Sequence, residues 1–253
     1  MNKRNTLIYV FSIIPITIVC NMQIVINENI KQLTPLEVVI NSLFSSVSIN
    51  NITVYAIVIE KLYYIIFFSL FFGTFIYKDF IIAKDYIFTR LSNRKKWFYK
   101  KSLKLFLFAS VYTFCLLLTL LLISIVSVNK GIHLVDLKPI AILWMNITIL
   151  LTCISIIQNV LSIKYNSSMG FIIMLIIFSF LIILAIKNIP SILRYPFILL
   201  INPMVSVILN MTGLIQMQII SSIYIILLVI TVCLLGAGYI DRLEIGIIKD
   251  ENY

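Results

Sequence analysis

The residues able to take part in chemistry are few, and they lie inside long apolar runs. Glu60 and Lys61 form the one adjacent ionisable pair in such a run. Ionisable residues inside a membrane segment are costly and mark functional sites, so this pair is a candidate gate or substrate contact; the alternative is an interfacial ion pair. Gln158 and Asn159 are candidates of the same kind, although we favour hydrogen bonds to a neighbouring helix.

A second group of residues is basic and tightly clustered. The stretch Phe88–Lys104 contains seven basic residues and no acidic residue. In a soluble protein such a cluster would favour nucleic-acid binding. In a membrane protein it favours a cytoplasmic loop, because Lys and Arg accumulate on that side and contact anionic headgroups. The basic residues are Arg90, Arg94, Lys95, Lys96, Lys100, Lys101 and Lys104.

Composition decides between these two interpretations. The chain is 61% hydrophobic and only 12% charged, with a mean hydropathy of +1.09. Soluble domains carry about 25% charged residues, so a soluble fold of this size is excluded. We therefore expect a multi-pass protein of the cell membrane that binds lipid and no nucleic acid, and the net charge of +10 is a topology signal.

The elements that position these residues are expected to be membrane-spanning helices of about 20 apolar residues each. We predict an all-α fold, a single transmembrane domain over residues 1–253 with six spans. A short helix is also predicted in the first outer loop, after Thr34-Pro35. The spans cover about residues 7–26, 54–77, 105–126, 140–161, 169–186 and 219–240.

The apolar segment 190–214 differs from these spans because it contains three prolines. Proline removes a helical hydrogen bond and clashes with the preceding turn. We predict a re-entrant helical pair before the last span, broken at Asn202-Pro203. The alternative is a kinked seventh span, which would move the C-terminus to the other side of the membrane.

The distribution of basic residues predicts the orientation. With a cytoplasmic N-terminus, fourteen of the 20 Lys and Arg residues fall on the inner side, nine of them between Lys78 and Lys104. This asymmetry favours cytoplasmic N- and C-termini. The charge alone leaves the seventh span open, because that span would move only the weakly charged tail.

The sequence contains no motif that indicates a metal site, a disulfide or a nucleotide-binding site. Cys20, Cys115, Cys153 and Cys233 all lie in apolar runs without a CxxC pair, so we expect neither a disulfide nor a metal site. The seven glycines nowhere form the phosphate-binding pattern GxxxxGK[ST]. We therefore expect this chain to bind no ATP and to catalyse no reaction.

The predicted cytoplasmic loop, residues 78–104, begins with helical periodicity. Within Asp79–Leu91 the apolar residues gather on one face, and Asp79, Asp85, Thr89 and Arg90 lie away from it. The order is thus an apolar helix, an amphipathic helix, a turn at residues 91–94 and a lysine-rich lead into the next span. The apolar face contains Phe80, Ile81, Ile87, Phe88 and Leu91.

This order resembles the permease subunits of ABC transporters of the ABC-2 type. In that family the loop between the second and third spans carries a coupling helix, then a leucine, a Pro-x-Ser-Arg turn and a lysine near the membrane. Here Leu91 is at the position of the leucine, and Ser92-Asn93-Arg94 replaces the turn, without the proline. Lys100 or Lys101 is at the position of the lysine. The six spans and the re-entrant pair are also similar to the family.

The resemblance implies a cytoplasmic ABC ATPase as partner. The ATPase would bind ATP and Mg²⁺ and would dock on the coupling helix, and nucleotide binding would move the spans between inward-open and outward-open states. It also implies a second permease subunit, either a second copy or a paralogue. The coupling interface implied for this chain consists of Phe80, Ile87, Phe88, Leu91 and Arg94.

The function expected from the resemblance is that of an ATP-driven exporter, with amphipathic or antimicrobial peptides as the expected substrates, for export or self-protection. This expectation comes by analogy with small permeases of the family and not from a recognised binding site. The alternative is a polytopic membrane protein without transport activity, such as an immunity or sensor-anchoring protein, in which the basic loop would serve only topology.

Overall fold

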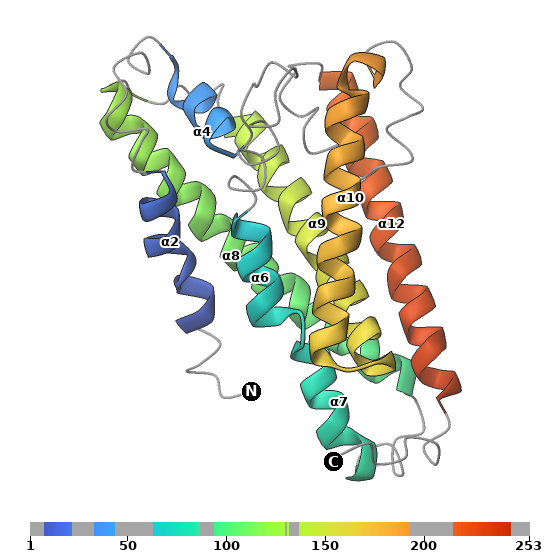
Figure 1. Ribbon diagram of the computed structural model, residues 1–253. Coiled ribbons are helices and arrows are strands. Elements are labelled where there is room, and N and C mark those ends of the chain that lie inside the picture. Colours follow the sequence, from blue (N-terminus) through green and yellow to red (C-terminus); the bar gives the residue numbers. More distant parts are fainter. Residues whose placement is uncertain are drawn as a thin grey trace.

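The computed structural model describes residues 8–21, 33–43, 63–86, 94–129, 131, 137–192 and 215–243. Every regular element in these ranges is an α-helix, which confirms the predicted helical class (Figure 1). The helices are α2 (Ile13–Cys20), α4 (Pro35–Leu43), α6 (Tyr63–Phe72), α7 (Phe75–Tyr86), α8 (Arg94–Val128), α9 (Leu137–Lys164), α10 (Ser167–Ile192) and α12 (Ile215–Arg242).

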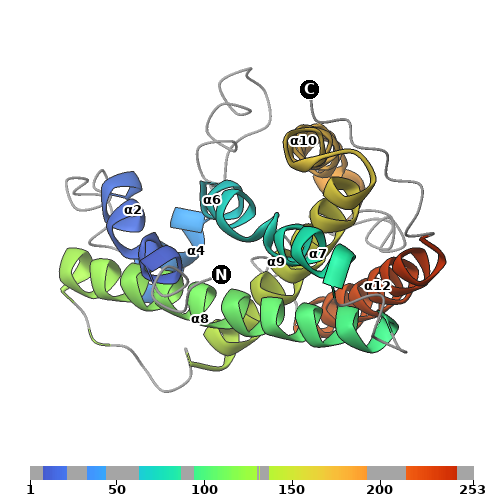
Figure 2. The ribbon, with the colours of Figure 1, turned by 90° about the horizontal axis from the view of Figure 1, so that it is seen from below.

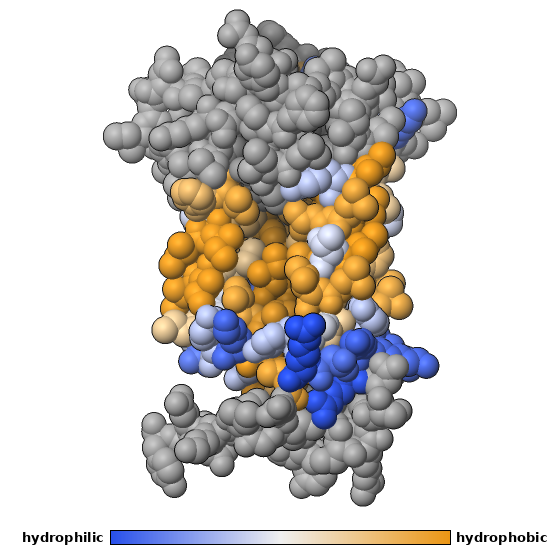
Figure 3. All heavy atoms as spheres, turned by 90° about the vertical axis from the view of Figure 1, so that its right-hand side faces the viewer, coloured by the Kyte–Doolittle hydropathy of each residue, from blue (hydrophilic) through white to orange (hydrophobic). Residues whose placement is uncertain are grey.

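Four helical stretches among the described residues are long and apolar enough to cross a membrane: Tyr63–Ile82, Arg94–Val128, Lys138–Lys164 and Ser222–Arg242. The first of them comprises α6 and most of α7. Two shorter apolar stretches among the described residues are Ile8–Cys20 and the first part of α10 (Ser167–Ile192), Ser167–Leu181. The space-filling view shows an apolar band with hydrophilic residues gathered below it (Figure 3). These features indicate a membrane protein.

Helix α9 lies at the centre of the bundle and packs against α6, α7, α8, α10 and α12 (Figure 2). Residues 146–156 are buried on every side of the helix. A helix that contacts protein on all sides can carry polar side chains that lipid would not accept. Seven polar residues of α9 are buried: Asn146, Thr148, Thr152, Ser155, Gln158, Asn159 and Ser162.

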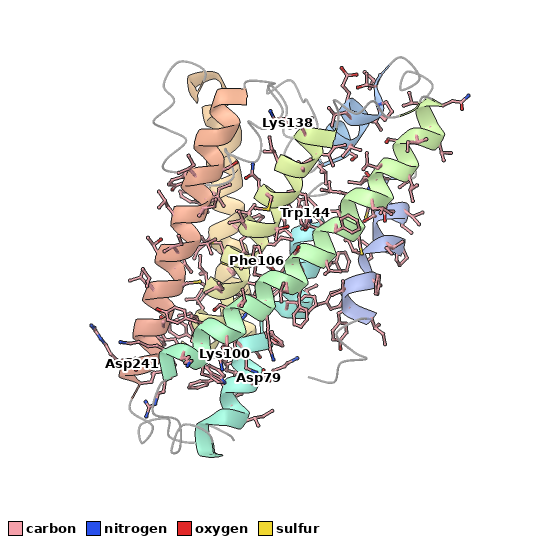
Figure 4. The ribbon with its side chains drawn as sticks, turned by 180° about the vertical axis from the view of Figure 1, so that it is seen from behind. Asp79, Lys100, Phe106, Lys138, Trp144 and Asp241 are labelled. Atoms are coloured by element: carbon pink, nitrogen blue, oxygen red, sulfur yellow. The ribbon has the colours of Figure 1, made fainter. Side chains whose placement is uncertain are left out.

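Helix α8 is the longest described helix, with 35 residues, and slants across the back of the bundle (Figure 4). It begins at Arg94, whereas the sequence predicts its span from residue 105. The difference has a physical reason: hydropathy marks where a helix enters lipid, and charged residues continue the same helix outside lipid. The lysine-rich lead into the span is therefore the first part of α8.

An aromatic cluster joins α6 and α7 to α8. The ring centroids of Phe68 and Tyr112 are 5.0 Å apart, and Phe72 and Phe108 are 5.5 Å apart. Phe75, the first residue of α7, packs edge-on against Phe108 at 5.4 Å. Such ring pairs contribute about 0.5–1.5 kcal/mol beyond their buried area. They hold both parts of the interrupted span against α8.

Two helix starts are fixed by local side chains. Thr34 and Glu37 form a capping box at α4: the Thr34 N–H donates to Glu37 Oε2 (2.7 Å), and the Glu37 N–H donates to Thr34 Oγ1 (3.3 Å). Helix α4 is the short helix predicted after Thr34-Pro35. At α10, Asn166 Oδ1 accepts from the Met169 N–H at 2.8 Å, which closes the tight turn between α9 and α10.

Helix α10 ends at Ile192, beyond the predicted limit at residue 186, and therefore includes Pro190. The rest of the predicted re-entrant segment, residues 193–214, lies outside the described residues. The same holds for the pair Glu60 and Lys61.

Candidate functional site

The candidate site is the end of the bundle at which α7, the start of α8 and the end of α12 meet. Three basic residues of α8 join these helices. Lys95 forms an ion pair with Asp241 of α12 at 3.1 Å, and the Arg94 Nη1 group donates a hydrogen bond to the carbonyl oxygen of Leu243 at 2.8 Å. Lys101 forms an ion pair with Asp79 of α7. Figure 4 shows Asp79 and Asp241 on either side of the start of α8.

The contacts with α12 have a favourable electrostatic setting. The C-terminal end of a helix carries a partial negative charge, and Leu243 directly follows α12. Arg94 and Lys95 are therefore well placed for α12. They are poorly placed for α8, whose first turn carries the positive end of its own dipole and contains no acidic residue. The first turn of α8 thus gains its favourable charge contacts from α12.

The contact between α7 and α8 is more enclosed. The side chains of Lys101 and Asp79 retain 22% and 17% of their exposure, against 52% and 43% for Lys95 and Asp241. The Lys101 ammonium group also lies 5.9 Å from the ring centres of Phe75 and Trp97. Exposed ion pairs contribute little to stability, whereas shielded pairs with cation–π contacts contribute more. Lys101 therefore holds α7 more firmly than Lys95 holds α12.

The span formed by α6 and α7 is interrupted at residues 73–74, where a side chain of α9 enters it. Asn159 Oδ1 accepts hydrogen bonds from the N–H groups of Ile76 (2.7 Å) and Tyr77 (3.0 Å). Its Nδ2 group donates to the carbonyl oxygen of Phe72 at 3.3 Å. In a continuous helix the Ile76 N–H would donate directly to that carbonyl. The Asn159 carboxamide is therefore inserted into the hydrogen-bond ladder, a known cause of helix distortion.

Gln158 supports the same interruption from the neighbouring position. Its Nε2 group donates to the carbonyl oxygen of Ser69 at 3.3 Å. Gly73 leaves the space that this side chain occupies, since a Cβ atom at Gly73 would lie 2.1 Å from the Gln158 carboxamide. Gln158 and Asn159 are 1% and 0% exposed, so the arrangement is closed to solvent. Together they form the joint between α6 and α7.

The structure describes only two of the five residues expected to form a coupling interface, Phe80 and Arg94. Phe80 is 5% exposed and packs into the hydrophobic core of the chain itself. Arg94 is bonded to the end of α12. Ile87, Phe88 and Leu91 lie outside the described residues.

Of the candidate gate or substrate contacts, Gln158 and Asn159 form the hydrogen bonds to another helix that the sequence favours. The pairing of Asp79 with Lys101 goes beyond the sequence prediction, which assigns Asp79 only to the polar face of a loop helix. A lone glycine inside an apolar run, Gly73, is the available signal for the joint.

Known proteins do not assign this arrangement to a family. Comparison with family models, curated proteins and solved structures finds no match.

That geometry connects one short helix to most of the bundle. Helix α7 extends beyond the lower ends of α9 and α10 (Figure 1). It is attached to α6 through the joint, to α9 through Asn159 and to α8 through Asp79 and Lys101. Ile81 and Ile82, near its end, are 49% and 67% exposed. A force applied to α7 would therefore reach α6, α8 and α9 directly.

Proposed function

We propose that this chain is the permease subunit of an ATP-driven ABC exporter of the ABC-2 type, with α7 as part of its coupling helix. The observation that supports the proposal most strongly is the construction of α7. From the joint onward the helix forms the second part of the interrupted span, it extends beyond the lower ends of α9 and α10 (Figure 1), and it carries two exposed isoleucines, Ile81 and Ile82, where that span ends. An exposed apolar pair at the end of a span, beside the charged end of the bundle, is suited to protein contact.

In the proposed mechanism the ATPase docks on the outer face of α7 and on the following residues, which include Ile87, Phe88 and Leu91. Closure of the ATPase on ATP and Mg²⁺ displaces α7. The Asn159 joint lets α7 tilt while α6 keeps its aromatic contacts, and the link between Asp79 and Lys101 transmits the displacement to α8. The chain catalyses no reaction; hydrolysis belongs to the ATPase.

We further propose that the exporter contains a second permease subunit, either a second copy or a paralogue, and that its substrates are amphipathic or antimicrobial peptides. Export of such peptides would provide secretion or self-protection. Opening of the bundle would bring the hydroxyl and amide groups of its central helix, which are buried in this structure, into contact with the polar parts of such peptides.

The orientation in the membrane belongs to the same proposal and has a direct test. Ser168, in the first turn of α10, and Lys138, at the start of α9, are exposed at opposite ends of the bundle. With a cytoplasmic N-terminus, a membrane-impermeant thiol reagent applied to intact cells should label Lys138→Cys and leave Ser168→Cys unlabelled. Labelling after permeabilisation controls for access, and the parent chain controls for its four own cysteines. The reverse pattern would contradict the proposed orientation.

The coupling role is tested on the two exposed isoleucines of α7, Ile81 and Ile82. Ile81→Ala combined with Ile82→Ala should lower the ATPase recovered with the purified chain at least tenfold, because truncation of an apolar anchor at an interface commonly costs about 2 kcal/mol. ATPase recovery is measured by mass spectrometry of co-purified proteins. The matched control is Leu118→Ala with Leu122→Ala, two exposed residues of α8 in the apolar band, 44% and 56% exposed.

Two results would decide against the proposal. One is an unchanged ATPase yield from the α7 variant. The other is the absence of any ATPase from the wild-type preparation, which would favour the alternative function, a membrane protein without transport activity.

A further inference from the structure

Five of the six basic residues at the start of α8 fall into two groups with different surroundings. Arg94, Lys95 and Lys101 are engaged by α12 and α7. Lys100 and Lys104 are exposed, and neither forms an ion pair with any residue that the structure describes. Figure 4 shows Lys100 on the outer surface of α8, between Asp241 and Asp79. The contacts of α8 with α7 and α12 therefore leave the charges of Lys100 and Lys104 available to bind an anion.

Lys100 and Lys104 lie on one face of α8. Residues four apart are separated by about 6 Å along a helix and by about 40° around it, so the two ammonium groups can reach the same anion. A single phosphate group has the size and charge to accept hydrogen bonds from both. Two lysines in this arrangement form an anion site with no need for a helix terminus.

The same face of α8 continues directly into apolar residues. Leu103, Leu107 and Val111 are 62%, 55% and 46% exposed. With about 100° per residue, all three lie within about 60° of Lys100 around the helix axis. The face continues through Phe114, Leu118 and Leu122, which are 55%, 44% and 56% exposed. Positive charge thus lies at the end of an apolar stripe long enough for an acyl chain.

We propose that Lys100 and Lys104 bind the phosphate of an anionic phospholipid whose acyl chains lie along Leu103, Leu107 and Val111. The headgroup lies at the boundary of the apolar band, and the chains run along the outer surface of α8. Charge complementarity selects an anionic over a zwitterionic lipid, because a zwitterionic headgroup brings its own cation to the site. The site does not depend on transport or on an ATPase.

A phospholipid fits this face better than a soluble phosphate compound does. A soluble anion would use the two lysines and leave the adjoining exposed leucines without a function. A phospholipid uses both parts at once, because its phosphate contacts the lysines and its chains contact the apolar stripe. The acyl chains also restrict the lipid to the membrane plane, which places the phosphate at the depth of the lysines.

The test is a lipid titration of the purified full-length chain, in which bound lipid is counted by native mass spectrometry. Phosphatidylglycerol is compared with phosphatidylcholine for the wild type and for Lys100→Gln combined with Lys104→Gln. The double variant should bind phosphatidylglycerol about 30-fold more weakly, since each lysine contributes about fivefold near a headgroup. Binding of phosphatidylcholine should not change.

The matched control removes the same charge elsewhere. Lys138 and Lys164, at the two ends of α9, are both exposed, and Lys138 lies at the opposite end of the bundle from Lys100 (Figure 4). Lys138→Gln combined with Lys164→Gln should retain the wild-type affinity for phosphatidylglycerol. An equal loss in both double variants would show that net charge, and not this site, attracts the lipid, which would overturn the proposal.

A second experiment distinguishes a binding site for phospholipid from a binding site for a soluble phosphate compound. Glycerol phosphate, the headgroup without acyl chains, is added in excess to the wild type already loaded with phosphatidylglycerol. It should displace little lipid, because it lacks the contacts with Leu103, Leu107 and Val111. Complete displacement at millimolar concentration would assign the lysines to a soluble phosphate compound and would contradict the lipid assignment.

Discussion

Asn159→Leu is expected to destabilise the bundle by about 3–5 kcal/mol. Leucine has a similar size but removes the carboxamide that satisfies the N–H groups of Ile76 and Tyr77 and the carbonyl of Phe72. Each buried backbone group left without a partner costs about 1–3 kcal/mol. Lipid offers no replacement, in contrast to water. Thermal unfolding in detergent can be followed with a thiol-reactive dye that fluoresces when buried Cys115 and Cys153 become accessible.

The same helix supplies the control. Asn146 is also 0% exposed, but neither its Oδ1 nor its Nδ2 atom has a hydrogen-bond partner in the described structure. Asn146→Leu should therefore be neutral or stabilising, because it removes two buried polar atoms that make no bond. A loss of stability in Asn146→Leu as large as that in Asn159→Leu would mean that the carboxamide at the joint has no special role.

Gly73→Ala is expected to destabilise the bundle by about 2 kcal/mol, although alanine is normally the better helix former. The added Cβ atom would lie 2.1 Å from the Gln158 carboxamide, so that side chain must leave its position and its bond to Ser69. Gly238→Ala in α12 is the matched control. No atom lies within 4 Å of a Cβ at Gly238, and there the substitution should gain about 0.5–1 kcal/mol.

A double-mutant cycle identifies the cause of the Gly73 effect. If the cost comes from the clash with Gln158, Gly73→Ala should cost nothing in a chain that already carries Gln158→Ala. The coupling energy should then be about 2 kcal/mol, within the range for residues in contact. Additive effects of the two substitutions would place the cost of Gly73→Ala elsewhere, for example in the break between α6 and α7.

Much of the helical layout follows from local properties of the sequence. Hydropathy predicts α8, α9 and α12 because a membrane span requires a long apolar run wherever it packs. The start of α4 follows from the Thr34-Pro35 step and from Glu37, which act within one turn. Hydropathy does not predict the first part of α8, because Arg94 and its neighbours are helical but not apolar.

The joint between α6 and α7 could not be predicted from local sequence properties. Asn159 forms hydrogen bonds with backbone groups that are 82 to 87 residues away in the sequence. The residues next to Asn159 do not indicate which groups these are. A buried amide in an apolar run predicts that a partner exists but not which helix supplies it. The same applies to Lys101, whose partner Asp79 is 22 residues away. The sequence does not distinguish the seven neighbouring basic residues from one another. Only the packing of the helices determines which of them form ion pairs.

The contact between Arg94 and Leu243 also has a consequence for the biogenesis of the protein. The two residues are 149 positions apart. A ribosome adding about 5–20 residues per second needs roughly 7–30 s to cover that interval. During this time the contacts of α8 with Asp241 and Leu243 cannot yet exist. Synthesis of residues 241–243 is therefore the step that allows these contacts of α8 to form, and a chain truncated before Asp241 would lack them.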